Sequence, residues 1–242
     1  MALRHLRLIA VNIDGVLLND TFSPVIHRFV TSRGGVYTAE LERAVLSQTQ
    51  LRAAAAMGVA GTPEEVVQEY FRERRAYLEQ NPVRVTEGAG ALLERLRATG
   101  ARLVCYGGLE RDHFERHLGA YADAFDEPLY VCTDGFRPGV REIAEDVFGV
   151  RCDEALFIDD VARVAEVAQE LGAAFIGHPT SYEHSFQRQL MRRAGVRHMV
   201  GSLDAIDERL VRAVDAEAAE GRLWAGSAGV PTASESMVPV GA

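Results

Sequence analysis

The chain has few of the residues that stabilise secreted proteins or anchor proteins in membranes. It contains three cysteines among 242 residues and no CxxC pair. Their spacing supports neither a disulfide framework nor a zinc cluster of histidines and cysteines. No stretch approaches the roughly 18 consecutive apolar residues that span a bilayer, and the N-terminus lacks a signal-peptide pattern. We therefore expect a cytoplasmic protein with no membrane partner.

Positive charge is also scarce. The chain has 26 Lys and Arg against 35 Asp and Glu, which gives a net charge of −9 at pH 7. No basic run could follow a phosphate backbone, so we expect no nucleic-acid partner. The apolar content of 48% is ordinary for a soluble globular chain. The length suffices for one large domain, or for one domain with a small module.

The stretch Leu6–Asp20 reads as a buried strand followed by a polar loop. Six of the eight residues from Leu6 to Ile13 are apolar, which is typical of a central parallel strand covered on both faces. Asn12 and Asp14 lie two residues apart at the end of this run, so their side chains should project the same way. In open α/β sheets that direction leads into the ligand-binding crevice. Gly15 then allows a sharp turn.

A helical insertion follows this first strand. Thr21–Gly35 should be irregular because it contains a proline and a pair of glycines. Thr38–Met57 has an approximate apolar face and is predicted to be one helix. A capping box at Thr62 begins a second helix, which should end near Gln80. Residues 21–84 are therefore expected to form a small all-helical module.

From residue 85 onward, strand-like and helical runs alternate. The expected strands are Ala101–Tyr106, Leu129–Thr133, Glu154–Asp160, Ala173–Ile176 and an edge strand at His198–Val200. The expected helices are Glu87–Thr99, Arg111–Leu118, Val140–Phe148, Val161–Leu171, Tyr182–Arg193 and Asp204–Glu220. Repeated βα units of this length predict an α/β fold with a doubly wound parallel sheet. Residues 1–20 and 85–220 should form this core, and the Gly-, Ala-, Ser- and Pro-rich residues 221–242 a disordered tail.

Four strand ends of the predicted sheet carry residues that could bind a ligand or take part in catalysis. These residues are Asn12 and Asp14, Gly107 and Gly108, Arg137, and Asp159 and Asp160. A set of carboxylates with a backbone carbonyl is the oxygen-only environment that Mg²⁺ prefers. An arginine suits an anion such as phosphate, and glycine N–H groups before a helix can form an anion cradle.

These motifs resemble those of the haloacid dehalogenase (HAD) superfamily, in the phosphoglucomutase-like phosphatase branch with a helical cap after the first strand. The resemblance covers about residues 6–212. Asn12-Ile13-Asp14-Gly15-Val16-Leu17 is similar to the first motif, Asp-x-Asp-Gly-(Thr/Val)-Leu. The second motif corresponds to residues 103–108, Arg137-Pro138 lies where the family has Lys-Pro, and residues 157–160 are similar to the acidic fourth motif. The resemblance implies a metal site at Asn12, Asp14, Asp159 and Asp160, and anion binding by Gly107, Gly108 and Arg137.

Three departures affect the chemistry that the resemblance implies. In such phosphatases the first aspartate attacks phosphorus and the second, here Asp14, protonates the leaving group. Asn12 stands at the attacking position, and its neutral amide oxygen is a poor nucleophile. It also removes one negative charge from the Mg²⁺ site, which should weaken it. Gly107 lacks the hydroxyl that the family usually has at this position. Arg137 has a planar guanidinium group where the family has the compact ammonium group of a lysine.

The departures leave several functions open. An engineered substitution at Asn12 would explain one departure and leave a true phosphatase, whereas natural divergence explains all three. A diverged protein could be an acid–base enzyme that uses Asp14, or a non-catalytic metabolite-binding or regulatory protein. We expect a hydrolase-family protein that acts on or binds a small phosphorylated or anionic metabolite, with the aspartyl-phosphate mechanism impaired. Exposed faces of the cap helices could also pair in a homodimer.

Overall fold

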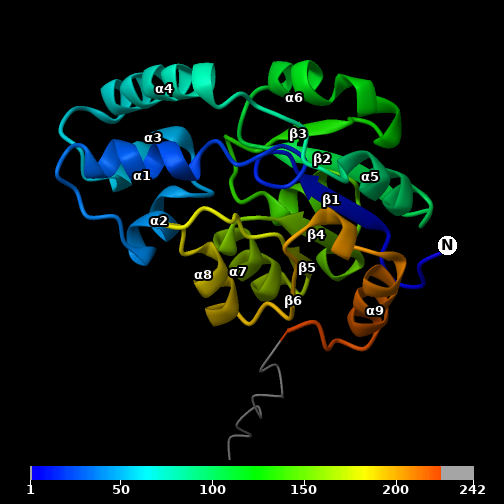
Figure 1. Ribbon diagram of the computed structural model, residues 1–242. Coiled ribbons are helices and arrows are strands. Elements are labelled where there is room, and N and C mark those ends of the chain that lie inside the picture. Colours follow the sequence, from blue (N-terminus) through cyan, green and yellow to red (C-terminus); the bar gives the residue numbers. More distant parts are fainter. Residues whose placement is uncertain (1, 225–242) are drawn as a thin grey trace, which may run out of the picture.

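The computed structural model describes residues 2–224, and its centre is a six-stranded parallel sheet (Figure 1). Along the sheet the strands follow the order β3-β2-β1-β4-β5-β6. Their bounds are β1 Leu8–Asn12, β2 Arg102–Gly107, β3 Tyr130–Cys132, β4 Ala155–Asp159, β5 Ala174–Gly177 and β6 His198–Met199. All pairings are parallel. The doubly wound α/β fold predicted from the sequence is confirmed.

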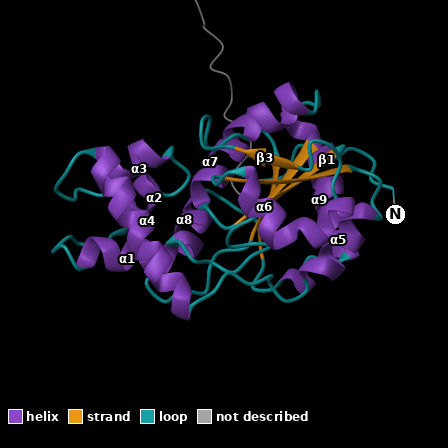
Figure 2. Ribbon diagram, turned by 90° about the horizontal axis from the view of Figure 1, so that it is seen from above, coloured by secondary structure: helices purple, strands orange, loops and turns teal. Residues whose placement is uncertain are grey.

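Helices flank the sheet and connect its strands (Figure 2). The α-helices of the core are α5 Ala89–Arg97, α6 Arg111–Leu118, α7 Ala162–Leu171, α8 Gln187–Arg193 and α9 Glu208–Ala219. Short 3₁₀ turns cover Gly119–Ala124, Cys152–Glu154 and Leu203–Ala205. Within residues 2–224, every helix is too short or too polar to cross a bilayer.

Strand β1 lies in the middle of the sheet and is buried along its whole length. It pairs with β2 on one side and β4 on the other, with Asn12 opposite Tyr106 of β2. Burial on both faces explains why this strand reads as a continuous apolar run instead of an alternating one. The polar residues that follow β1 are thereby placed between the ends of two neighbouring strands.

Four helices between β1 and α5 form the cap: α1 Ser23–Thr31, α2 Ala39–Val45, α3 Gln50–Ala56 and α4 Pro63–Gln80. They have a hydrophobic cluster of their own, separate from that of the sheet, in which Phe29 and Tyr70 are buried. Figures 1 and 2 show the cap beside the carboxyl end of β1. Helix α4 begins with the capping box expected at Thr62, whose side chain accepts the Glu65 N–H while Glu65 accepts the Thr62 N–H.

Two expectations about the cap are wrong. The segment Thr21–Gly35 is not irregular, because α1 occupies most of it. Pro24 lies in the first turn of α1, where the N–H group that proline lacks would have no hydrogen-bond partner within the helix. The segment Thr38–Met57 is not one helix, since the chain leaves helical geometry at Leu46 and has a positive φ of 63° at Ser47. Both differences lie where local signals compete with packing of the apolar face.

Two further expectations about the core need correction. The segment Val140–Phe148 contains a wider π-helix, Glu142–Val147, in place of an α-helix. The predicted tail begins too early, because Leu223 and Trp224 are buried and Trp224 stacks on Phe175 with ring centroids 6.2 Å apart. The remainder of that predicted tail, residues 225–242, lies outside the described residues.

Candidate active site

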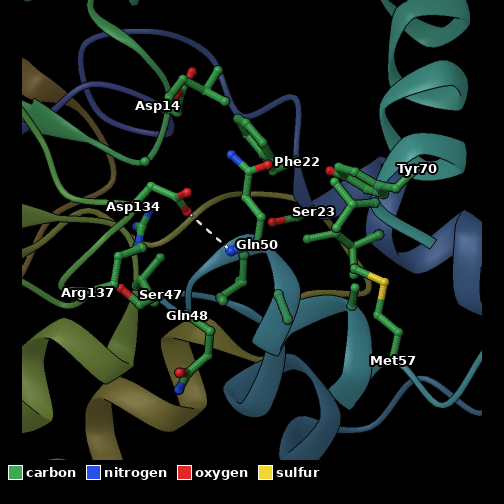
Figure 3. A pocket seen from close by; sticks show the side chains of 18 of the residues that line it. Asp14, Phe22, Ser23, Ser47, Gln48, Gln50, Met57, Tyr70, Asp134 and Arg137 are labelled. Atoms are coloured by element: carbon green, nitrogen blue, oxygen red, sulfur yellow. Dashed lines mark hydrogen bonds between the residues drawn. The ribbon is translucent and has the colours of Figure 1, made fainter. Parts of the chain in front are cut away.

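A cavity of about 130 Å³ separates the cap from the carboxyl edge of the sheet (Figure 3). Its core wall is polar and includes Asn12, Asp14, Asp134, Arg137 and Asp160. Its cap wall is largely apolar and includes Phe22, Ile26, Met57, Val66, Tyr70 and Phe71. An apolar protein cavity of roughly 150 Å³ can hold a benzene molecule. The cavity therefore suits a small ligand with one polar end and an apolar part about the size of one ring.

The cap wall also offers polar atoms that lack partners in residues 2–224. These are the hydroxyl of Tyr70, the hydroxyl of Ser47 and the Oδ2 of Asp20. The other oxygen of Asp20 accepts the N–H groups of Phe22 and Ser23, at 2.9 and 3.0 Å, and so caps α1. Buried polar atoms without a protein partner require water or a ligand. They are available to hydrogen-bond a molecule in the cavity.

Asn12 is buried at the end of β1 and is 4% exposed. Its side-chain nitrogen donates to the backbone carbonyl of Asp14 at 2.8 Å and to Oδ1 of Asp160 at 2.9 Å. The carboxamide is therefore held in place by two oxygens that accept its hydrogens. A nitrogen donor in this position offers no lone pair for attack on an electrophile.

Asp14 forms a hydrogen-bonded pair with His113 of α6. The Nε2–H of His113 donates to Oδ1 of Asp14 at 2.9 Å, and the two side chains are only 11% and 13% exposed. Among the described residues, only this oxygen of Asp14 has a hydrogen-bond partner, so the other is free to contact a ligand. Such a carboxylate can exchange a proton with a bound molecule.

Sequence reasoning did not identify His113. A signal existed, because α6 begins directly after the β2 loop, next to the end of β1, and carries His113 and His117 on one face. Residues four apart on a helix lie above each other. However, the pattern does not reveal which way that face turns, since this depends on how α6 packs on the sheet.

Asp159 and Asp160 lie at the end of β4 but face different surroundings. Asp159 is fully buried and accepts hydrogen bonds from the hydroxyl of Tyr106 and from the N–H of Val161, so both its oxygens are engaged. Burial raises its pKa to about 6, against the lowering effect of these donors. Asp160 lies against Gly15, whose φ is +86°. Burial and the neighbouring Asp159 raise the pKa of Asp160 well above its ordinary value.

The glycines of the β2 loop are required by close packing. A Cβ on Gly107 would lie 2.4 Å from Cγ2 of Ile13, and one on Gly108 would lie 1.7 Å from Nη1 of Arg137. A hydroxyl side chain of the kind expected at Gly107 therefore has no room. Arg137 rests directly on the backbone of Gly108, its Nε has no hydrogen-bond partner, and it forms no ion pair within residues 2–224. Its guanidinium is available for an anionic ligand.

The structure brings together part of the predicted metal set. The side chains of Asn12 and Asp160 and the carbonyl of Asp14 are neighbours, whereas the oxygens of Asp159 are occupied by protein donors. Among residues 2–224, no three His, Cys, Asp or Glu side chains are grouped closely enough to hold a metal ion. As these residues are arranged, they do not fit Mg²⁺, because a nitrogen donor lies between the two oxygens that would bind it.

Polar contacts hold the cap against the core around the cavity. The buried Glu42 of α2 accepts the hydroxyl of Ser185 at 2.8 Å and the N–H of Phe186 at 2.6 Å. Arg43 donates to the carboxylate of Glu166. Burial raises the pKa of Glu42, although these hydrogen bonds lower it. In Figure 3 the N–H of Gln50 also points to Asp134, at 3.2 Å.

No family model and no curated protein sequence matches the chain. Solved structures do match. A conserved haloacid dehalogenase-like protein of unknown function from Agrobacterium tumefaciens has a TM-score of 0.59 and 18% identity, over 88% of this chain and 100% of that one. A HAD family hydrolase from Deinococcus radiodurans with bound phosphate and sodium has a TM-score of 0.56 and 18% identity, over 91% and 98%. An inferred β-phosphoglucomutase from Bacteroides vulgatus has a TM-score of 0.64 and 16% identity, over 88% and 90%.

Proposed function

Because the chain has the haloacid dehalogenase-like fold with a helical cap, we propose that it is a hydrolase-type enzyme for a small anionic metabolite. The ligand lies between cap and core, with its anionic group at Arg137 and its apolar part among the cap residues. Asp14 exchanges the proton that hydrolysis moves, and His113 holds Asp14 in position. One observation carries the proposal: Asp14, which is paired with His113, and an arginine without an ionic partner in residues 2–224 line one wall of a cavity whose other wall is largely apolar.

The charges on the cavity wall favour a ligand with a single negative charge. Asp14, Asp20, Asp134 and Asp160 line the cavity, and Arg137 is the one cationic side chain among the described lining residues. A doubly charged phosphate would meet several carboxylates and one arginine, and like charges in a partly buried site repel strongly. A carboxylate needs one arginine and matches its two parallel N–H groups. A molecule with one carboxylate and an apolar body is therefore a better ligand than a phosphate ester.

An aspartyl-phosphate intermediate has no part in this proposal. The residue at the attacking position is Asn12, whose nitrogen donates hydrogen bonds to Asp14 and Asp160. Removal of a covalent nucleophile lowers kcat by roughly 10⁶-fold in a well-studied hydrolase. We therefore expect phosphatase activity near background on aryl phosphates, with or without Mg²⁺. No step of the proposed reaction uses the magnesium ion expected from the sequence.

A ligand screen by thermal shift tests the binding part of the proposal. The library contains aromatic and branched aliphatic carboxylates together with their phosphate-ester counterparts. We expect carboxylates to raise the Tm of the wild type, because a ligand that binds only the folded state stabilises it. Arg137→Gln should weaken binding by roughly 10- to 150-fold, which corresponds to about 1.5–3 kcal/mol for a charge-assisted hydrogen bond. The exposed Arg141→Gln on the following helix is the matched control. Preference for phosphate esters would refute the proposed ligand.

Turnover of a ligand from this screen tests the role of Asp14. Asp14→Asn should abolish turnover and leave the Kd within a few-fold of the wild type. His113→Ala should lower kcat and shift the pH profile, whereas His113→Gln, which keeps a donor, should recover part of the rate. His117→Ala, one turn further along α6, is the control. Binding without turnover in the wild type would instead show a metabolite-binding protein.

A further inference from the structure

We infer that the side-chain amide of Asn12 replaces a divalent cation in this crevice, so that the wild-type protein binds no metal there. The inference concerns the resting protein and does not depend on the proposed ligand or on turnover.

The amide nitrogen of Asn12 uses both of its hydrogens on oxygens that would suit a cation. One acceptor is the backbone carbonyl of Asp14 at 2.8 Å, and the other is Oδ1 of Asp160 at 2.9 Å. Backbone carbonyls and carboxylates are the ligands of hard cations, which bind such oxygens at roughly 2.0–2.6 Å. A cation between these two oxygens would have to displace the nitrogen that now lies between them. Both oxygens are satisfied without a metal.

The amide cannot easily move aside. Asn12 is 4% exposed, at the end of a strand that is buried along its whole length. Asp160 is held against Gly15, where a Cβ would come within 2.1 Å of its Oδ2. Without a cation, a rotation that exchanged the amide nitrogen and oxygen would set the Asn12 oxygen against two other oxygens with no hydrogen between them, so the metal-free protein keeps the nitrogen in this place.

The other carboxylates do not supply a replacement ligand set. Both oxygens of Asp159 are engaged by protein donors, namely the Tyr106 hydroxyl and the Val161 N–H. The carboxylate of Asp14 is paired with His113. Only one carbonyl and one carboxylate oxygen, those of Asp14 and Asp160, lie directly against the amide nitrogen, and the affinity for hard cations depends on the number of ligands and on their charge.

The substitution Asn12→Asp should therefore create a metal site that the wild type lacks. A carboxylate at this position removes the two hydrogens and places negative oxygens against the Asp14 carbonyl and Asp160. Without metal, the variant should be less stable than the wild type, because like charges in a buried site repel. A divalent cation should relieve this repulsion. If the new site has a Kd near 0.1 mM, about 10 mM Mg²⁺ raises the Tm by roughly 5–10 °C.

Two measurements test the inference on the full chain. Thermal unfolding is followed with chelator and with about 10 mM MgCl₂, a concentration about 100 times that Kd, and Mn²⁺ binding is followed from the loss of the free-ion signal in electron paramagnetic resonance. The variants are wild type, Asn12→Asp, and Asn81→Asp, which makes the same change at the exposed end of α4. We expect Mg²⁺ to shift the Tm of Asn12→Asp alone, and this variant alone to bind Mn²⁺ at one saturable site.

Each outcome decides the question. Saturable Mn²⁺ binding by the wild type that disappears in Asp160→Asn would overturn the inference, and this measurement needs no change at Asn12. Failure of Asn12→Asp to gain a metal-dependent Tm, including failure to fold in Mg²⁺, would also count against it. If no small-molecule carboxylate binds in the ligand screen, or if no turnover is found, only the proposed function fails. The failure of the metal inference and the failure of the proposed function are therefore distinguishable.

Discussion

Replacing Asp215 by asparagine should destabilise the protein by about 3 kcal/mol, through loss of the contacts that fix the N-terminus. Asp215 lies in α9 and is 5% exposed. Its Oδ2 accepts the N–H of Arg4 at 2.8 Å, and its Oδ1 accepts those of His5 and Leu6 at 3.0 and 2.8 Å. One carboxylate therefore positions the residues that lead directly into β1.

The magnitude follows from what an amide can still do there. Asparagine keeps one oxygen, which can serve two of the N–H groups, but its NH₂ faces the third as a second donor. One N–H is left unsatisfied, at about 1–3 kcal/mol. The other two hydrogen bonds change from charged to neutral acceptors and lose about 1 kcal/mol together or somewhat more. For a chain of this size, about 3 kcal/mol corresponds to a Tm lower by roughly 6–12 °C.

The effect of Asp215 should also depend on pH in a defined direction. Burial alone would raise the pKa of Asp215, but the N–H groups of Leu6, Arg4 and His5 hold it below the ordinary value. A carboxyl with a lower pKa in the folded state stabilises the fold above its unfolded pKa of about 3.9. That stabilisation is lost as the pH falls through the folded pKa. The difference between wild type and variant should therefore shrink in acid.

Urea unfolding followed by circular dichroism, at pH 7 and near pH 3, measures both effects. The matched control is Asp207→Asn at the N-cap of the same helix, where the side chain accepts a single N–H, that of Leu210. Asparagine is about as good an N-cap as aspartate, so this control should change stability by less than about 0.5 kcal/mol. Equal losses for the two variants, or a loss for Asp215→Asn that does not shrink in acid, would refute the reasoning.

Two substitutions around the cavity give further predictions. Gly108→Ala should weaken binding of an anionic ligand by about tenfold or more without a change in charge, because its Cβ would occupy the place of Nη1 of Arg137; calorimetry that finds unchanged affinity would contradict this. Glu42→Gln should keep the cap docked, since its amide can accept from Phe186 and donate to the hydroxyl of Ser185, whereas Glu42→Ala should cost about 1–3 kcal/mol. Hydrogen exchange in α2 should then be faster in the alanine variant alone.

Local patterns in the sequence predicted the architecture because the parallel sheet imposes a recognisable pattern on each strand. The run that ends at Asn12 is apolar since β1 is covered on both faces. The Thr62 capping box marked the start of α4 because its hydrogen bonds join residues three apart. The residue at position 12 is itself a matter of sequence, and the expectation that no aspartyl-phosphate forms depends on it alone.

Packing between distant segments decided the parts of the fold that local signals missed. Pro24 reads as a breaker, yet it lies in the first turn of α1, which the apolar cluster of the cap stabilises. The break at Ser47 lets α2 and α3 pack separately. Trp224 reads as part of a tail, but it stacks on Phe175 of β5. Burial of apolar surface outweighs propensities of a few tenths of a kcal/mol per residue.

The residues of the crevice also depend partly on the sequence and partly on the tertiary structure. The sequence by itself determined which residues follow each strand. In a doubly wound sheet the carboxyl ends of the neighbouring strands β1, β2 and β4 lie at one edge, so these residues come together there. Only the tertiary structure placed His113 beside Asp14, turned Asp159 toward Tyr106, and set the amide of Asn12 between two oxygens. Those contacts join side chains as far as 99 and 148 positions apart along the chain, so their directions depend on packing that no local period encodes.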